Sequence, residues 1–377
     1  MNQINCCVPC LFGLEALVAQ ELKNIGAENV QPENGRVFFT GSRETVIDAN
    51  LWLRTGQRVE IVLGRFPART FDELFEGVRA LPWEQWIPED GRFPVKGHAL
   101  NSKLHSIPDC QKIVKKAIVR RLERHYKREI FLEDGALYSV RFSILKDQAV
   151  LMLDTSGQAL HKRGYRPGTQ PAPIRETLGA ALCMLARPYP DTQLYDPFCG
   201  SGTLLIEGAM LARNMAPGLT RGFMAEHWES FPRALWMERR KAAREAAKPD
   251  VPFRGFGFDI DPKMTAIALE NAKHAGVADC LSFGVRDVKD FTLDTPRGMV
   301  VTNPPYGERL LDQTQARELY KVMGKVFEKR PGWRYYVIAP EKDFERLFGR
   351  PADKRRKLYN GTLECNYFQY FKAERAK

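Results

Sequence analysis

The second half of the chain alternates short apolar runs with stretches of helical periodicity, and this alternation restricts the possible fold more than any other feature. The runs are too short to be helices and are typical of buried strands. Parallel strands need a crossover helix between them and are buried on both faces. From residue 174 onward we therefore expect an α/β, Rossmann-like domain with helices on both faces of a mostly parallel sheet. The expected strands are Gln193–Tyr195, Phe256–Phe258, Leu281–Val285, Met299–Thr302 and Trp333–Ala339.

The first of these strands runs into a glycine-rich turn, D-P-F-C-G-S-G-T at residues 196–203, which opens a helix through Met210. Gly200 and Gly202 permit a tight turn and let the backbone approach a ligand closely. The turn lacks both the lysine of a P-loop and the third glycine of a dinucleotide-binding fingerprint. The acid at its start, Asp196, suits a cationic or amino-bearing ligand better than a pyrophosphate.

A second motif, G-F-D-I-D-P at residues 257–262, follows the next strand. Asp259 can accept the hydroxyls of a ribose, and Asp261 can cap the following helix. The usual spacing from glycine turn to acid is about 20 residues. A charged helical stretch at 234–247, which we interpret as a solvated surface insertion, makes the spacing longer here. Asp287 follows a third strand in the same geometric position and can bond an adenine amino group.

The third motif is Asn303-Pro304-Pro305-Tyr306, directly after the strand Met299–Thr302. Two consecutive prolines exclude a helix and fix a stiff turn. Its carbonyl groups and the Asn303 amide can accept N–H bonds from an exocyclic amino group, and Tyr306 offers a face on which a base can stack. A strand-terminating turn with a packed tyrosine is the alternative interpretation.

The first 155 residues mix strands and helices without regular crossovers, which indicates α+β structure. We expect two small units at 1–64 and 65–155, with Ser42 capping a helix in the first. Proline and glycine crowd the stretch 156–173, which reads as an interdomain linker. The Rossmann-like domain then occupies 174–377.

The second unit contains a strongly basic helix that begins near Pro108. Its basic residues repeat every four positions, as Lys112, Lys116, Arg120, Arg124 and Arg128. A solvated helix face normally mixes both signs of charge, whereas this one is almost entirely positive. Together with a formal net charge of +11, it favours contacts with nucleic acid phosphates. Lys103 upstream, and Arg163 and Arg166 in the linker, are further candidates for such contacts.

Several classes of protein fit the composition poorly. The eight cysteines are scattered, and the pair Cys7 and Cys10 has no second pair of ligands nearby, so we expect buried free thiols and no metal. No run approaches the ~20 apolar residues of a membrane span. The N-terminus has no signal-peptide pattern. We expect a cytoplasmic protein with no membrane partner.

Together the motifs resemble the class I methyltransferases that modify amino groups of bases. The chain is most similar to the THUMP-domain RNA methyltransferases, which include bacterial 23S ribosomal RNA guanine-N2 methyltransferases and are often labelled N6-adenine-specific DNA methylases. The segment L-H-S-I-P-D at 104–109 is similar to the THUMP segment of this family, and L-H-K-R-G-Y-R at 160–166 resembles its junction with the catalytic domain. The resemblance implies ferredoxin-like, THUMP and S-adenosylmethionine-dependent methyltransferase domains, in that order.

Carried over residue by residue, the resemblance implies three groups of site residues. The residues implied to bind S-adenosylmethionine are Asp196, Cys199, Gly200, Gly202, Thr203, Asp259, Ile260, Asp287 and Asn303. The residues implied to hold the target base and act in catalysis are Asn303, Pro304 and Tyr306. The residues expected to bind RNA are Lys103, Lys112, Lys116, Arg120, Arg124, Arg163 and Arg166.

The resulting hypothesis is methylation of a base amine in RNA, with guanine N2 of 23S ribosomal RNA as the implied target. Three alternatives remain at this stage. One is N6-adenine methylation of DNA, which shares the N-P-P-Y motif. Another is a non-catalytic RNA-binding ribosome assembly factor, which the intact acids argue against. The last is a dinucleotide oxidoreductase, which the missing third glycine argues against.

Overall fold

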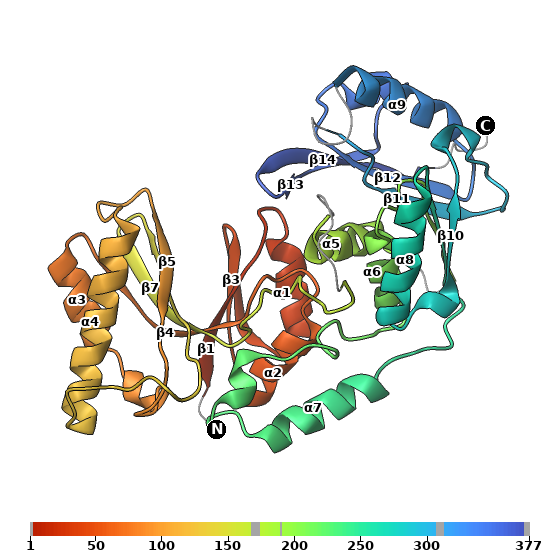
Figure 1. The fold of residues 1–377 in the computed structure, drawn as a ribbon. Helices are drawn as coiled ribbons and strands as arrows, with labels where there is room; N and C mark the ends of the chain where they lie inside the picture. Colours follow the sequence, from red (N-terminus) through yellow and green to blue (C-terminus); the bar gives the residue numbers. More distant parts are fainter. Residues whose placement is uncertain (1–2, 167–173, 189–190, 307–312, 373–377) are drawn as a thin grey trace. The chain divides into compact units, whose positions relative to one another are not determined.

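The computed structural model describes residues 3–166, 174–188, 191–306 and 313–372, and the chain forms two compact units. Neither unit is continuous in sequence. Unit 1 comprises Met1–Cys10, Val18–Leu160 and Gly222–Lys241, and unit 2 comprises Leu11–Leu17, His161–Arg221 and Ala242–Lys377. Each unit contains one seven-stranded sheet, and Figure 1 follows the chain through both.

The sheet of unit 1 has the strand order β2-β3-β1-β4-β7-β6-β5. Its strands are β1 (Ile4–Pro9), β2 (Glu28–Glu33), β3 (Arg36–Gly41), β4 (Glu60–Pro67), β5 (Val95–Leu100), β6 (Val140–Leu145) and β7 (Gln148–Asp154). Neighbouring strands are antiparallel except for β5 and β6. Because β4 pairs with both β1 and β7, the two small units expected from the sequence share one continuous sheet.

The helical elements of unit 1 that precede residue 160 each bury part of their surface. They are α1 (Glu15–Asn24), which begins in unit 2, α2 (Arg43–Trp52), α3 (Phe71–Ala80), the short η1 (Trp83–Gln85) and α4 (Ile107–Tyr126). Ser42 caps α2 as predicted, since its side chain accepts from the Thr45 amide. On α4, the apolar residues Val114, Ala117, Ile118 and Leu122 are buried.

The stretch 234–247, interpreted from the sequence as a solvated insertion, is helical and mostly exposed, although Trp236 and Ala243 are buried. The overlapping segment Gly222–Lys241 is packed into unit 1. It contains η2 (Met224–His227) and the start of α7 (Arg233–Glu245). Trp228 is 2% exposed, stacks on Tyr138 at 4.7 Å between ring centroids and donates its Nε1–H to the Leu137 carbonyl at 2.8 Å. Large aromatic side chains bury area that charge patterning alone does not reveal. The segment is therefore an integral part of unit 1.

The sheet of unit 2 has the order β10-β9-β8-β11-β12-β14-β13. Its strands are β8 (Gln193–Asp196), β9 (Arg254–Asp259), β10 (Leu281–Val285), β11 (Gly298–Thr302), β12 (Trp333–Ala339), β13 (Lys354–Asn360) and β14 (Leu363–Tyr370). The first five are mutually parallel, and β14 is antiparallel to both of its neighbours. The expectation of an α/β domain with a mostly parallel sheet is confirmed.

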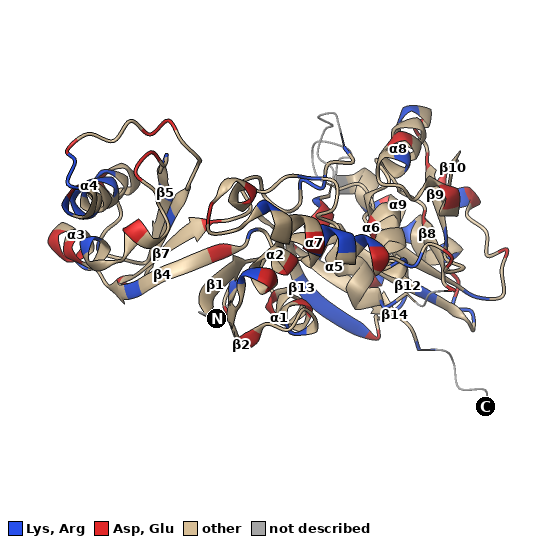
Figure 2. Ribbon diagram, turned by 90° about the horizontal axis from the view of Figure 1, so that it is seen from below, with Lys and Arg blue, Asp and Glu red and all other residues tan. Residues whose placement is uncertain are grey.

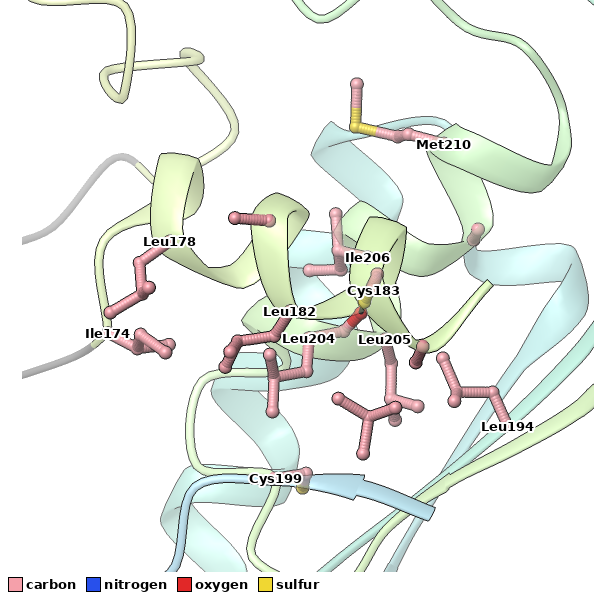
Figure 3. Packing of buried hydrophobic residues seen from close by; sticks show 14 of the residues in the cluster. Ile174, Leu178, Leu182, Cys183, Leu194, Cys199, Leu204, Leu205, Ile206 and Met210 are labelled. Atoms are coloured by element: carbon pink, nitrogen blue, oxygen red, sulfur yellow. Dashed lines mark hydrogen bonds between the residues drawn. The ribbon is translucent and has the colours of Figure 1, made fainter. Parts of the chain in front are cut away.

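Helices cover both faces of this sheet. Beyond α7, the helices and short 3-10 turns of unit 2 are α5 (Glu176–Ala186), α6 (Thr203–Ala212), α8 (Pro262–His274), η3 (Ala278–Cys280), η4 (Val288–Asp290), α9 (Gln313–Val326) and α10 (Phe344–Phe348). One buried cluster joins α5, α6 and α8 to the sheet, and another joins α9 and α10 to its other face. Figure 3 shows leucine and isoleucine side chains of α5 and α6 in the first cluster, with the Cys183 thiol bonded to the Leu204 carbonyl. All eight cysteines are buried and free, as expected.

Within the described residues, no helix is both long enough and apolar enough to cross a membrane. The same residues contain no group of three or more His, Cys, Asp and Glu side chains placed to hold a metal ion.

Replacing Trp228 by alanine is expected to destabilise unit 1 by about 3–5 kcal/mol, because it leaves a large cavity and an unpaired Leu137 carbonyl. Urea unfolding followed by circular dichroism measures the loss. Met237→Ala is the control, since Met237 lies in the same segment but is 62% exposed, and its cost should stay within about 0.5 kcal/mol. Equal stabilities for the two variants would contradict the packing role of Trp228.

Candidate active site

The candidate site lies at the carboxyl ends of four adjacent parallel strands. In the order β10, β9, β8 and β11, these strands lead to Asp287, Asp259, Asp196 and Asn303. From β8 the chain crosses to β9 on one side, and from β11 it crosses to β12 on the other side. The direction in which the chain adds strands therefore reverses between β8 and β11. Such a switch point opens a crevice at the carboxyl edge, where open α/β sheets bind ligands. Residues about 110 positions apart in sequence therefore lie at the same edge of the sheet. The hydrogen bond between Thr302 and Asp196, which are 106 positions apart, is an example.

Asp259 anchors the glycine-rich turn to the end of β9. Its Oδ2 accepts from the Gly200 amide at 2.9 Å and its Oδ1 accepts from the Asp261 amide at 3.0 Å. Gly200 and Gly202 have φ angles of +48° and +81°, which favour glycine. A Cβ on Gly202 would lie 3.1 Å from the Ala268 Cβ, so the turn also packs tightly against α8. The predicted cap is confirmed as well, because Asp261 accepts from the Lys263 amide at 2.9 Å.

Asp196 is a buried carboxylate at the switch point. Only 1% of its surface is exposed, and its Oδ1 accepts from the Thr302 hydroxyl at 2.7 Å and the Phe198 amide at 3.2 Å. Burial raises the pKa of Asp196 to about 7, the two hydrogen bonds oppose that shift, and the nearby Asp259 charge adds to it. A ligand that brings a positive charge to this position would stabilise the ionised form.

The Asn-Pro-Pro-Tyr turn places one unsatisfied acceptor in the site. The Asn303 Oδ1 is buried and has no hydrogen-bond partner among the described residues. Buried acceptors are almost always paired, since leaving one unpaired costs about 1–3 kcal/mol. Residues 307–312, which continue the motif, lie outside the described part of the chain.

Tyr306 is held by the β13–β14 hairpin. Its hydroxyl accepts from the Asn360 amide group at 2.7 Å and lies near the Cys365 thiol, and its ring packs against the core cluster of α5, α6 and α8. Burial raises the pKa of Tyr306. The Tyr306 side chain is therefore held in place at its hydroxyl end and remains partly exposed. The alternative interpretation, a packed tyrosine, describes the hydroxyl end of the side chain.

The remaining predicted cofactor residues differ in accessibility. Ile260 is 71% exposed directly after Asp259, where it can cover a flat ligand. Asp287 caps η4 through the Lys289 amide, and that bond lowers the pKa of Asp287. Cys199 and Thr203 are at most 5% exposed, so their side chains serve packing within the turn.

Of the residues expected to contact RNA, Arg163 is buried and Arg166 is partly buried. Arg163 is 2% exposed and pairs with the buried Glu207 on α6, which also accepts from Tyr165 at 3.1 Å. Arg166 donates to the Thr203 hydroxyl and pairs with Glu176 at 3.5 Å. Sequence alone does not reveal these partners of the two arginines, and their contact with RNA stays a prediction. The described part of the linker is packed, and 167–173 lie outside the described residues.

The other five predicted RNA-binding residues lie on the surface of unit 1. Lys103, Lys112, Lys116, Arg120 and Arg124 are all exposed, and the last four share α4. Arg120 pairs with Glu123 at 2.8 Å, and Lys112 lies 3.8 Å from Asp109. Figure 2 shows that α4 is marked mainly by lysine and arginine. Exposed pairs of this kind are weak, so the face remains available to phosphates.

Three further residues shape the site but carry no recognisable sequence signal. Thr302 bonds Asp196, Asn360 bonds Tyr306, and the Asn271 side chain donates to the Ser201 carbonyl at 2.9 Å. Of the three, only Thr302 lies next to a recognised motif, since it directly precedes Asn303-Pro304-Pro305-Tyr306.

The strand order with its reversal, the acids at three strand ends and the Asn-Pro-Pro-Tyr turn define a class I methyltransferase domain. The chain belongs to the family described as "RMKL-like, methyltransferase domain", which it matches over residues 163–369. Residues 5–60 match the "RlmL ferredoxin-like domain" and residues 68–154 match the THUMP domain. The expected order of domains and, at the level of the family, the use of S-adenosylmethionine are confirmed.

Relatives share almost the whole chain. "Putative RNA methyltransferase YpsC" of Bacillus subtilis is 46% identical over 362 residues, which are 96% of this chain and 94% of that protein. A "predicted N6-adenine-specific DNA methylase" from Listeria monocytogenes has 45% identity and a TM-score of 0.93, with 98% of this chain and 97% of that chain covered. SMU.472, "a putative methyltransferase complexed with SAH", has 43% identity and a TM-score of 0.94, with both chains fully covered at 100%.

The pKa of Asp196 predicts how cofactor affinity depends on pH. With that pKa at about 7, the ligand-free site holds a proton below neutrality, whereas a cationic amino group favours the ionised carboxylate. Affinity for S-adenosylmethionine should therefore rise as the pH increases through about 7, by up to roughly tenfold per pH unit, and level off above it. Calorimetric titration between pH 5.5 and 8.5 measures this.

Two variants test the assignment of that midpoint to Asp196. Asp196→Asn should remove the pH dependence. Thr302→Val deletes a bond to the ionised carboxylate and should move the midpoint upward. A profile that is unchanged in both variants would show that another group titrates.

Proposed function

We propose that this protein transfers the methyl group of S-adenosylmethionine to the exocyclic amine of a base in RNA, with guanine N2 of 23S ribosomal RNA as the target. The observation that carries the proposal is the Asn303 Oδ1 at the switch point, which is buried and has no hydrogen-bond partner among the residues that the structure describes. An exocyclic amine supplies the N–H donor that this acceptor lacks. The name of YpsC and the THUMP match support RNA as the polymer that presents the base.

The residues of the site fit S-adenosylmethionine. The glycine turn lets the backbone approach the ligand, and Asp196 provides an anionic position beside it. Asp259 keeps further lone pairs for ribose hydroxyls after bonding two amides. The exposed Ile260 offers an apolar surface for adenine. When bound, S-adenosylmethionine supplies a methyl group on a positively charged sulfur.

The Asn-Pro-Pro-Tyr turn acts on the amine. The lone pair of that nitrogen is delocalised into the base, so it is a poor nucleophile. Acceptance of an N–H bond by Asn303, and of another by the Pro304 carbonyl, would hold the hydrogens and direct the lone pair at the methyl carbon. The new N–C bond replaces the S–C bond, whose electron pair remains on sulfur, and the surplus proton leaves to water. Positioning and preorganised dipoles supply the rate.

Removing the Asn303 acceptor should separate chemistry from cofactor binding. Asn303→Ala is expected to lower kcat by roughly 10²–10³-fold, a far larger loss than any change in the affinity for S-adenosylmethionine. Labelled S-adenosylmethionine is offered with unmodified ribosomal RNA, with transfer RNA and with duplex DNA, and the product nucleoside is identified by mass. Full activity in the variant would refute the role of Asn303. Formation of N6-methyladenine in DNA by the wild type would overturn RNA as the substrate.

Charge reversal on α4 tests the RNA-binding face. Lys116→Glu, Arg120→Glu and Arg124→Glu together should weaken RNA binding and reduce the slope of log affinity against log salt by about 2–3, since each lost phosphate contact removes about 0.7–0.9. Lys23, Arg43 and Arg233 are exposed basic residues of unit 1 outside α4, so their reversal to glutamate is a control with the same change in charge. Equal losses in both triple variants would show that net charge alone determines binding.

A further inference from the structure

The β13–β14 hairpin reaches the same edge of the sheet as the candidate active site. Because β14 runs antiparallel to β12, its first residue, Leu363, lies beyond the carboxyl end of β12. The turn between β13 and β14 therefore projects at the edge where β8, β9 and β11 end. The hydrogen bond from Asn360 to the Tyr306 hydroxyl shows that this turn contacts the Asn-Pro-Pro-Tyr motif directly.

Next to Asn360, the hairpin carries an aromatic pair. The rings of Tyr359 and Phe12 lie 6.2 Å apart between centroids at an interplanar angle of 64°. Phe12 is 56% exposed, although phenylalanine is a residue type usually buried. Both residues belong to unit 2, since the segment Leu11–Leu17 is part of it.

The backbone beside Phe12 is fixed against β13. The Arg356 guanidinium donates to the Gly13 carbonyl. Gly13 has a φ of +87°, and a Cβ at this position would lie 3.0 Å from the Lys357 carbonyl oxygen. Phe12 is thus held at the surface by a defined turn, and its exposure is built into the fold.

The strand beneath this aromatic pair is basic. Residues 354–357 read Lys-Arg-Arg-Lys, and Figure 2 shows them as a band of blue along β13. The side chains of Arg355 and Lys357 are 60% and 55% exposed; Arg355 pairs with the partly buried Glu345 and Lys357 with the exposed Glu364. The Lys357 Nζ lies 5.6 Å from the centroid of the Tyr359 ring. Positive charge therefore surrounds an exposed stacking surface.

We propose that Phe12 and Tyr359, together with the basic strand β13, bind an unpaired nucleotide next to the target base, which rests on the proposed function. The target must leave its helix to reach Asn303, so its neighbours lose their own stacking partners. An exposed ring replaces that lost stacking for any base, and adjacent lysine and arginine side chains neutralise the phosphates. A duplex offers no base face to such a surface.

The test uses the full-length protein and a phenylalanine matched in exposure. Phe12→Ala and Tyr359→Ala are compared with Phe371→Ala, because Phe371 is 41% exposed and follows β14 at the opposite edge of the same sheet. The affinity of each variant for a short single-stranded oligouridine and for an RNA duplex is measured by fluorescence anisotropy. Methyl transfer to unmodified ribosomal RNA is measured in parallel.

For Phe12→Ala and Tyr359→Ala, the expected result is a loss of roughly five- to fifty-fold in single-strand affinity and a similar rise in KM for RNA. Affinity for the duplex and for S-adenosylmethionine, and every value of Phe371→Ala, should stay within about twofold. If Phe12→Ala binds oligouridine as Phe371→Ala does, the stacking surface is refuted. If the wild type methylates no RNA but the two variants still lose single-strand affinity, the surface stands and the proposed function fails.

Discussion

The buried hydrogen bond between Thr302 and Asp196 is the contact on which the site depends. It joins the ends of β11 and β8, the two strands between which the sheet reverses direction. On the β8 side, the chain turns into the glycine-rich loop that Asp259 holds from β9. On the β11 side, the next residue is Asn303, whose buried Oδ1 has no partner within the described part of the chain. Together with the pairing of β8 and β11, this bond holds the part of the site that suits a cofactor beside the part that suits a base.

Two arginine side chains contact the helix that follows the glycine-rich loop. Arg166 bonds Thr203 at the first position of α6, and Arg163 pairs with Glu207 one turn further along that helix. A buried ion pair adds little net stability, because desolvation offsets the attraction, but losing one partner leaves an isolated charge at a large cost. The two arginines therefore connect the segment 160–166 to the first turns of α6, directly after the glycine turn.

The sequence predicted the parts of the fold that depend on a local pattern of residues and the strands that are buried on both faces of the sheet. The strands β8 to β12 are apolar runs and Ser42 is a local cap, so both were confirmed. The hairpin was missed because β13 reads K-R-R-K-L-Y-N, in which only Leu358 is buried. An edge strand of this kind obtains its structure from the pairing with β14. The same limit explains Arg163, whose partner lies 44 positions away.

The division into units shows why linear domain boundaries describe this chain incompletely. Segment Leu11–Leu17 belongs to unit 2, where Leu14 is fully buried in the same cluster as Leu358. Segment Gly222–Lys241 lies between α6 and β9 in sequence but packs in unit 1 through Trp228. Each core therefore needs residues from the other half of the sequence. Because of this exchange, neither core is complete until distant segments of the chain have been placed.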